Sequence, residues 1–421
     1  MVYSTAIAVV VLTIILQIVV VHYKYNMITI ITGPIIINVI PFIMVGQYDN
    51  NQLRINGIPI AYIPILTTML VLFLHERHNS HKYLRKISYI STTLTLYIII
   101  SSLVHINTIQ ATMPYVMMYV VYFMILFCVA SNASRLDKNE FNEVIKNVMY
   151  VIVVATVVGI IKYISGISKD GNFMPLLNRN GTTLWVVTGG IMALYSFINR
   201  IISWKKAFII YAILCVGIVL TMSRMGVISF VFGQIVFIML LKGMVIKRMF
   251  QVIIVIIIVF VALSILMPST LDRIISLKNI SQVYVNDTTI YKGMPDYRRT
   301  ELIRAGIYNI KNNWLFGTGP GLENYKEGLK GFIITTHVGK AHNFYISYLA
   351  ELGIVGFSMF IYLLILILSL LRKIINSRQR SLFVSFWITI MFMLLMNEYI
   401  TIPEVWIIWG MGIGVSMKKD V

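Results

Sequence analysis

Cysteine and charge are both scarce in this chain of 421 residues. Its 2 cysteines, Cys128 and Cys215, each fall within an apolar run, so the sequence supports neither a disulfide framework nor a cysteine-based metal site. Charged residues make up 12% of the chain and hydrophobic residues 58%. Because about 25% of the residues in a soluble globular protein are charged, this composition excludes such a protein and indicates a polytopic membrane protein.

Acidic residues are the scarcer of the two charged classes. The chain has 16 Asp and Glu against 35 Lys and Arg, which gives a formal net charge of +19. The basic residues are scattered over short connections and form no cluster in a soluble domain, which argues against nucleic-acid binding. Anionic membrane lipids and phosphate-bearing lipid substrates fit this charge better. The sequence shows no acidic cluster, so we expect no bound divalent metal.

Apolar runs occupy most of the chain. The first lacks the basic start and the small-residue cleavage site of a signal peptide, so we expect it to span the membrane. Most runs approach the ~20 residues that a bilayer core requires, and they predict an all-α polytopic protein with about 13 transmembrane helices, within a range of about 12 to 14. The expected spans are residues 5–21, 27–46, 58–74, 87–104, 114–130, 148–165, 184–199, 207–222, 225–241, 249–267, 344–371, 381–397 and 405–417.

The basic residues predict how these spans are oriented. Alternate connections carry most of them, including those with Lys146 and Arg378, and the positive-inside rule places these connections in the cytoplasm and the N-terminus outside. The long connection then lies outside as well, since long translocated loops largely escape the rule. We therefore expect an N-terminal bundle of about 10 spans (1–267), an extracytoplasmic loop with a surface helix (268–341) and a C-terminal bundle of about 3 spans (342–421).

The end of the long loop gathers glycines and histidines. Gly317, Gly319, Pro320 and Gly321 form a turn cluster that a helix interior would not tolerate, and a histidine pair follows before the next apolar run. The second histidine, His342, stands with Asn343 at an expected helix start. Unpaired backbone N–H groups at such a start favour a polar or anionic partner.

A surface helix is predicted just before this turn. Apolar residues recur at helical spacing in the order Leu302, Ile303, Gly306, Ile307, Ile310 and Trp314, which indicates an amphipathic helix on the outer surface. At about 100° per residue, Arg299 falls within the apolar face, Arg298 at its edge and Arg304 nearly opposite.

The motifs of this region resemble those of a known family. GTGPG, followed by HNFYISYLAELGIVG running into an apolar segment, is similar to the O-antigen ligase and polymerase family of bacterial envelope glycosyltransferases, and the likeness is strongest over residues 296–357. NRN at 178–180 and TMSRMG at 221–226 are weaker matches, with Met225 standing where a glycine is common. The expected topology places all three segments outside. The resemblance implies a metal-independent, inverting glycosyltransferase that needs no cofactor, only arginines and a histidine.

The candidate site residues follow from these motifs and from chemistry. Guanidinium groups bind diphosphate oxygens bidentately, so Arg179, Arg224 and Arg299 are the candidate clamp for a polyprenyl diphosphate. His342 is the candidate general base, because imidazole accepts a proton near neutral pH. The remaining candidate substrate-binding residues are Arg298 as the register alternative, Asn180, Asn343, Glu351 and His337.

Less specific interpretations stand beside these assignments. Arg224 and Arg299 could snorkel beside apolar surface, Arg179 could be a solvated loop residue and His342 could merely cap a helix. We expect Glu351 to pair with a nearby arginine. GTGPG lacks the strand, lysine and hydroxyl of a nucleotide-binding loop.

We expect a polymerase of O-antigen or capsule type in the bacterial cytoplasmic membrane, with its active site on the extracytoplasmic side. It would transfer a polyprenyl-diphosphate-linked glycan onto a lipid-linked repeat unit, in company with membrane lipids, a chain-length regulator and a flippase. The alternatives are a ligase that transfers the glycan to another anchor, or a flippase for lipid-linked oligosaccharide. A flippase would carry charged residues along an inner cavity, whereas here ionisable residues crowd the outer side.

Overall fold

The computed structural model describes residues 27–28, 54–55, 58–59, 82–105, 109–166, 179–241, 295–332 and 339–418. In these ranges the protein is helical apart from a short antiparallel pair, β1 (Arg54–Ile55) and β2 (Ile58–Pro59). The expected spans at 5–21 and 249–267, almost all of those at 27–46 and 58–74, and loop residues 268–294 lie outside the described residues.

Every expected span in the described remainder forms a helix. Five of these helices are long and apolar enough to cross a membrane, namely α4, α5, α6, α7 and α15, so the total of about 13 spans stays a prediction. The helices are α4 (Lys82–Val104), α5 (Ile109–Arg135), α6 (Lys138–Ile164), α7 (Arg179–Ile198), α8 (Trp204–Leu220), α9 (Arg224–Leu240), α13 (Pro295–Asn312), α14 (Leu322–Glu327), α15 (Phe344–Leu371), α16 (Ser377–Met393), η4 (Tyr399–Thr401) and α17 (Pro403–Ser416).

Local sequence sets several of the helix starts. Asp137 and Glu140 form a capping box at α6, in which each side chain accepts a hydrogen bond from the backbone of the other residue. The Asn376 side chain caps α16 by accepting from the backbone N–H groups of Arg378 and Gln379. These caps satisfy donors that a helix start leaves unpaired.

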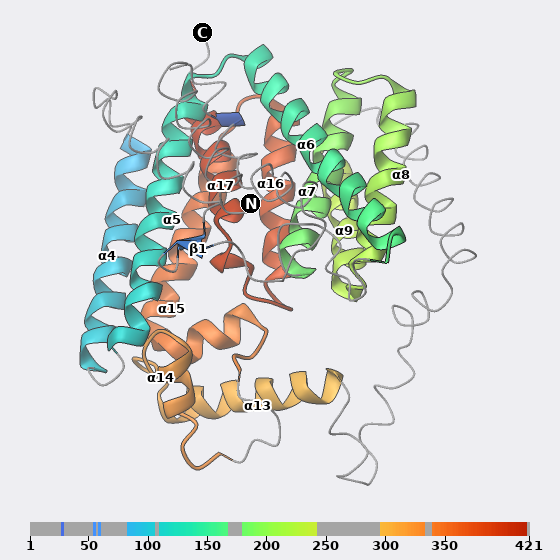
Figure 1. Cartoon of the computed structure of the whole chain (residues 1–421). Helices are drawn as coiled ribbons and strands as arrows, with labels where there is room; N and C mark the ends of the chain where they lie inside the picture. Colours follow the sequence, from blue (N-terminus) through green and yellow to red (C-terminus); the bar gives the residue numbers. More distant parts are fainter. Residues whose placement is uncertain are drawn as a thin grey trace.

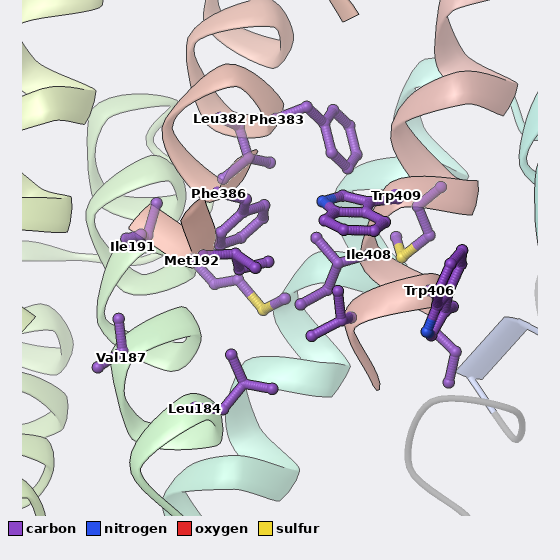
Figure 2. Close-up of a cluster of buried hydrophobic side chains, with 14 of the residues drawn as sticks. Leu184, Val187, Ile191, Met192, Leu382, Phe383, Phe386, Trp406, Ile408 and Trp409 are labelled. Carbon is purple, nitrogen blue, oxygen red and sulfur yellow. The ribbon is translucent and has the colours of Figure 1, made fainter. Parts of the chain in front are cut away.

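The core lies where α7, α16 and α17 meet. Figure 2 shows Met192 of α7 between Phe386 of α16 and Ile408 of α17. Helix α17 packs along α5, where Gly410 and Gly414 leave no room for a Cβ against the backbone carbonyls of α5. Glycines spaced by four residues let two apolar helices approach closely.

The basic connections gather at one end of the bundle. Arg378 donates from Nη1 to Asn199 Oδ1 at 3.1 Å, and Ser381 donates to the backbone carbonyl of Leu240 at 2.9 Å. Lys418 donates to the backbone carbonyl of Leu136 at the same end. We call this the basic end; α13 and α14 lie at the opposite end (Figure 1).

The predicted surface helix is α13, and it packs on α15. Leu302 and Gly306 are buried and Arg304 is exposed, as the predicted register requires. The apolar face is nevertheless rotated, since Ile307 and Trp314 are 42% and 59% exposed. Small and polar residues occupy the face that packs on α15 instead. The packing there is close, since a Cβ at Gly306 would lie only 2.9 Å from the Tyr325 hydroxyl.

Helix α15 is broken at Gly353, which the sequence pattern did not predict. Gly353 has φ 61° and ψ −175°, a conformation confined to glycine. The turn cluster fills the break: Thr318 and Gly319 donate backbone hydrogen bonds to the carbonyls of Ala350 and Glu351 at 2.9 and 3.0 Å. In return, Ile354 donates to the carbonyl of Trp314 at 2.8 Å. The backbone groups freed by the break are thus satisfied by the loop, as a membrane-embedded helix requires.

Gly353→Ala should be strongly destabilising. Its backbone conformation costs a residue with a Cβ about 1–3 kcal/mol, and the added carbon would collide with the backbone of Leu315. Gly331→Ala is the control, because Gly331 has φ 90° but its nearest neighbour, the Tyr308 hydroxyl, is 3.6 Å from the added carbon. The thermal unfolding midpoint of detergent-purified protein should fall much further for Gly353→Ala, and equal falls would contradict the collision.

Candidate functional site

The start of α15 is fixed by the segment that follows α16. The Asn343 side chain caps α15 by accepting from the backbone N–H of Ile346 at 3.1 Å, and its Nδ2 donates to the carbonyl of Leu395 at 2.9 Å. Phe344 donates its backbone N–H to the carbonyl of Leu394 at 3.0 Å. The expected helix start is therefore confirmed, and both ends of the Asn343 amide are held by the protein.

His342 lies next to this cap and does not itself form it. Its side chain is exposed, while neighbouring Ala341 is buried against α13 near Gly306. The backbone of His342 has φ 48°, a left-handed conformation that few residues with a Cβ adopt. The anchored residues on both sides hold the backbone of His342, and its side chain lies at the surface of the protein.

Arg224 is the first residue of α9, where the Ser223 side chain caps the helix by accepting from the backbone of Gly226 at 3.0 Å. Helices α9 and α16 run antiparallel, with Leu240 beside Ser381 and the rings of Phe232 and Phe392 4.5 Å apart. Arg224 lies more than two turns before Phe232 in α9. Because the helices are antiparallel, it is level with the segment that follows Met393 at the end of α16. The half-buried arginine lies at the same end of the bundle as His342.

Helix α7 begins beside α9. A Cβ at Gly226 would lie 2.8 Å from Thr183, so the starts of the two helices are adjacent. Arg179 and Asn180 form the first residues of α7 and are thereby placed at this end, although only their backbone is described. For Arg298 in α13, too, only the backbone is described. His337 lies outside the described residues.

Arg299 lies in the first turns of α13, near η4. Its side chain is exposed, not buried with Leu302 as the predicted register suggested. Burial raises the pKa of Tyr399, and the positive charge of Arg299 acts against that rise, which places the guanidinium near η4. Arg299, Arg224 and His342 therefore share one end of the molecule. The partial positive charges of the starts of α7, α9, α13 and α15 add to the charge of the arginines there.

A buried ion cluster that we did not predict lies beside His342. Lys340 Nζ is 2.5 Å from Glu351 Oε1 and 3.7 Å from Glu398 Oε2. The partner of Glu351 is thus a lysine, and the expected arginine pairing was wrong. Burial lowers the pKa of Lys340, but the two carboxylates raise it by more, so its pKa lies above the ordinary value and the lysine stays charged. Glu398 lies so far from Glu351 in sequence that no spacing rule would have joined them.

Lys340→Met should destabilise the protein by about 3–5 kcal/mol, because it leaves the Glu351 carboxylate buried without its cation. Lys340→Met/Glu351→Gln should recover most of that loss. Lys326→Met is the matched control: its ion pair with Glu323 is exposed, and such pairs contribute about 0–1 kcal/mol. Thermal unfolding of the purified variants measures all three, and a double variant no more stable than Lys340→Met would contradict this interpretation.

The fold and these residues define a class: a helical membrane protein with candidate arginines and a histidine at one end of its bundle. A family model described as Wzy_C, O-antigen ligase, matches residues 209–361, which include Arg224, Arg299, His342 and Glu351. This match confirms the resemblance in sequence to the O-antigen ligase and polymerase family over this part of the chain. No curated protein matches the chain.

Proposed function

We propose that this protein is a polysaccharide polymerase that transfers a polyprenyl-diphosphate-linked glycan onto a lipid-linked repeat unit. The family supports glycan transfer of the O-antigen ligase or polymerase type in general. The observation that carries the proposal is the convergence of the starts of α7, α9, α13 and α15, which brings the candidate arginines to the end that carries His342.

The arginines act on the leaving group. The diphosphate of the donor concentrates negative charge, and guanidinium groups bind its oxygens while the helix starts favour the same charge. Arg224 and Arg299 have the central role. Arg179 begins α7, whose start is adjacent to that of α9, and Arg298 precedes Arg299 in α13. Their charge stabilises the lipid diphosphate as it departs from the anomeric carbon.

His342 acts on the other reactant. The acceptor hydroxyl loses its proton to the imidazole as its oxygen bonds to the anomeric carbon, and the bond from that carbon to the diphosphate oxygen breaks. Attack opposite the departing diphosphate inverts the anomeric configuration. The transfer needs no nucleotide, because the donor arrives already activated by its lipid diphosphate. It needs no metal, because the arginines stabilise the charge of the departing diphosphate.

The site faces outward in this proposal. The basic end gathers the connections that the positive-inside rule assigns to the cytoplasm, and the site lies at the other end. This places transfer at the outer face of the bacterial cytoplasmic membrane.

Thiol labelling tests the orientation. Cysteine at Lys146 or Ser377 should react with a membrane-impermeant thiol reagent only after permeabilisation, and cysteine at Lys169 or Asn286 should react in intact cells. Replacing Cys128 and Cys215 beforehand removes the background. Labelling of Asn286→Cys only after permeabilisation would contradict the outward site.

Transfer by the purified protein tests the function. The protein in lipid nanodiscs is given the lipid-linked repeat units isolated from its own source, without nucleotide. A ladder of products spaced by one repeat unit supports the polymerase. Transfer of a single block to a second anchor supports a ligase instead, and no transfer contradicts both.

A further inference from the structure

A pocket opens beside the site, and none of the roles assigned above uses it. Its volume is about 370 Å³, within the ~300–1,000 Å³ of small-molecule sites. Elements far apart in sequence form its walls: Tyr115 and Met118 of α5, Leu322 of α14, Lys340 ahead of α15, and Glu398 and Thr401 at η4. Lys340 stands two residues before His342, so the pocket adjoins the segment that carries the candidate base.

The charged groups of the pocket are unsuited to a phosphate. Lys340 is the cation in its wall, and Glu351 and Glu398 both lie within 4 Å of its Nζ. The charge of Lys340 is offset by Glu398 in the same wall and by Glu351, which does not line the pocket, so the wall offers no net positive charge, in contrast to the arginine-bearing helix starts nearby.

Glu398 has hydrogen-bonding capacity to spare. The residue lines the pocket, and among the described residues its Oε2 has only the long 3.7 Å contact with Lys340. An ionised carboxylate only accepts hydrogen bonds, so the missing partner is a donor. The hydroxyls of a sugar are donors of this kind.

The rest of the wall suits a sugar ring. Lys340 Nζ lies 4.6 Å from the centroid of the Tyr115 ring and so orients that ring through a cation–π contact. Tyr115 and Met118 supply apolar surface for the C–H face of a sugar, and Thr401 lies among the residues around it. A mainly apolar wall with a few fixed polar groups is typical of a small-molecule site.

We propose that this pocket binds an uncharged sugar of the acceptor, with Glu398 accepting hydrogen bonds from its hydroxyls and the Tyr115 ring supporting its apolar face. The proposal rests on the proposed function and assigns the acceptor subsite within it. The reacting carbon of the donor is bonded to diphosphate and belongs at the arginines. The attacking hydroxyl of the acceptor is on a sugar remote from its own diphosphate, which fits a pocket without net positive charge next to the segment that carries His342.

The test uses the repeat-unit oligosaccharide released from its lipid by mild acid. This molecule has no leaving group and therefore serves only as acceptor. Its Kd for protein in nanodiscs is measured by saturation-transfer NMR, and its KM is measured in transfer from saturating lipid-linked donor. Glu398→Gln should raise both by about tenfold to a hundredfold, the effect of losing hydrogen bonds to a charged group, with little change in kcat. Tyr115→Leu should also raise both.

The controls separate a local effect from misfolding. Glu398→Gln leaves the 2.5 Å contact of Lys340 with Glu351 in place, so its thermal unfolding midpoint should match that of the wild type. Glu323→Gln removes an exposed carboxylate of α14 and should change neither Kd nor KM.

The outcomes distinguish the pocket from the function. Unchanged Kd and KM in Glu398→Gln, with a wild type that polymerises, would overturn the acceptor subsite and leave the polymerase intact. Loss of oligosaccharide binding in Glu398→Gln, with a wild type that binds but transfers nothing, would keep the sugar pocket and overturn the polymerase. Displacement of the oligosaccharide by inorganic pyrophosphate, with tighter pyrophosphate binding in Glu398→Gln, would show a phosphate site instead.

Discussion

His342→Ala should leave cells with single unpolymerised repeat units while the amount of protein in the membrane is unchanged. General acid–base catalysis contributes roughly 10²–10⁴-fold, and alanine cannot take the proton of the acceptor hydroxyl. The backbone of His342 is held between Ala341, packed against α13, and Asn343, hydrogen-bonded to Leu395, which limits where the imidazole can reach. Polymer length on a gel and protein abundance by immunoblotting measure the two quantities.

His342→Asn separates chemistry from structure. Asparagine is among the residues that best tolerate the left-handed conformation found at this position, and Asn343 remains to cap α15. The variant should therefore fold and still lack polymer. Full-length polymer from His342→Asn would exclude His342 as the base. His337→Ala should retain long chains, because we assign the base to His342 alone.

Arg224→Lys and Arg299→Lys should each cause a severe loss of polymer with the protein still in the membrane. Lysine keeps the charge but loses the planar fork that binds two phosphate oxygens at once. Losing one charge-assisted contact costs about 1.5–3 kcal/mol, which corresponds to a roughly tenfold to hundredfold lower rate of transfer if the contact forms in the transition state. Transfer by purified variants with saturating lipid-linked substrate measures this rate.

Arg304→Ala is the matched control for the arginine pair. Arg304 is exposed on α13 like Arg299, but it lies on the face away from α15 and is more than one turn further along the helix. Its removal should change the transfer rate little. A larger loss for Arg304→Ala than for Arg299→Lys would assign the diphosphate to the other face of α13. Near-normal chain length in both lysine variants would exclude bidentate binding.

Local signals in the sequence predicted the helices and the start of α15. Apolar runs and their flanking residues depend on neighbours a few positions away, and the described helices follow them closely. The same periodicity predicted that Leu302 and Gly306 are buried and Arg304 exposed. It failed for Ile307 and Trp314, because close packing of α13 on Tyr325 and Ile346 favours small residues on the contact face. Polar motifs also identified the segment around His342.

Only the tertiary structure decided the break in α15 and the partner of Glu351. An uninterrupted apolar run gives no sign that its backbone opens at Gly353, since the freed groups are satisfied by residues 314–319, which precede the helix. Likewise, Lys340 meets both Glu351 and Glu398 because the segment after α16 folds back onto the start of α15. The sequence by itself thus determined which residues form helices and which segments carry polar chemistry. The packing of remote segments determined which charges meet. A buried charge or a freed carbonyl needs a partner, and that partner comes from a segment that only the fold places beside it.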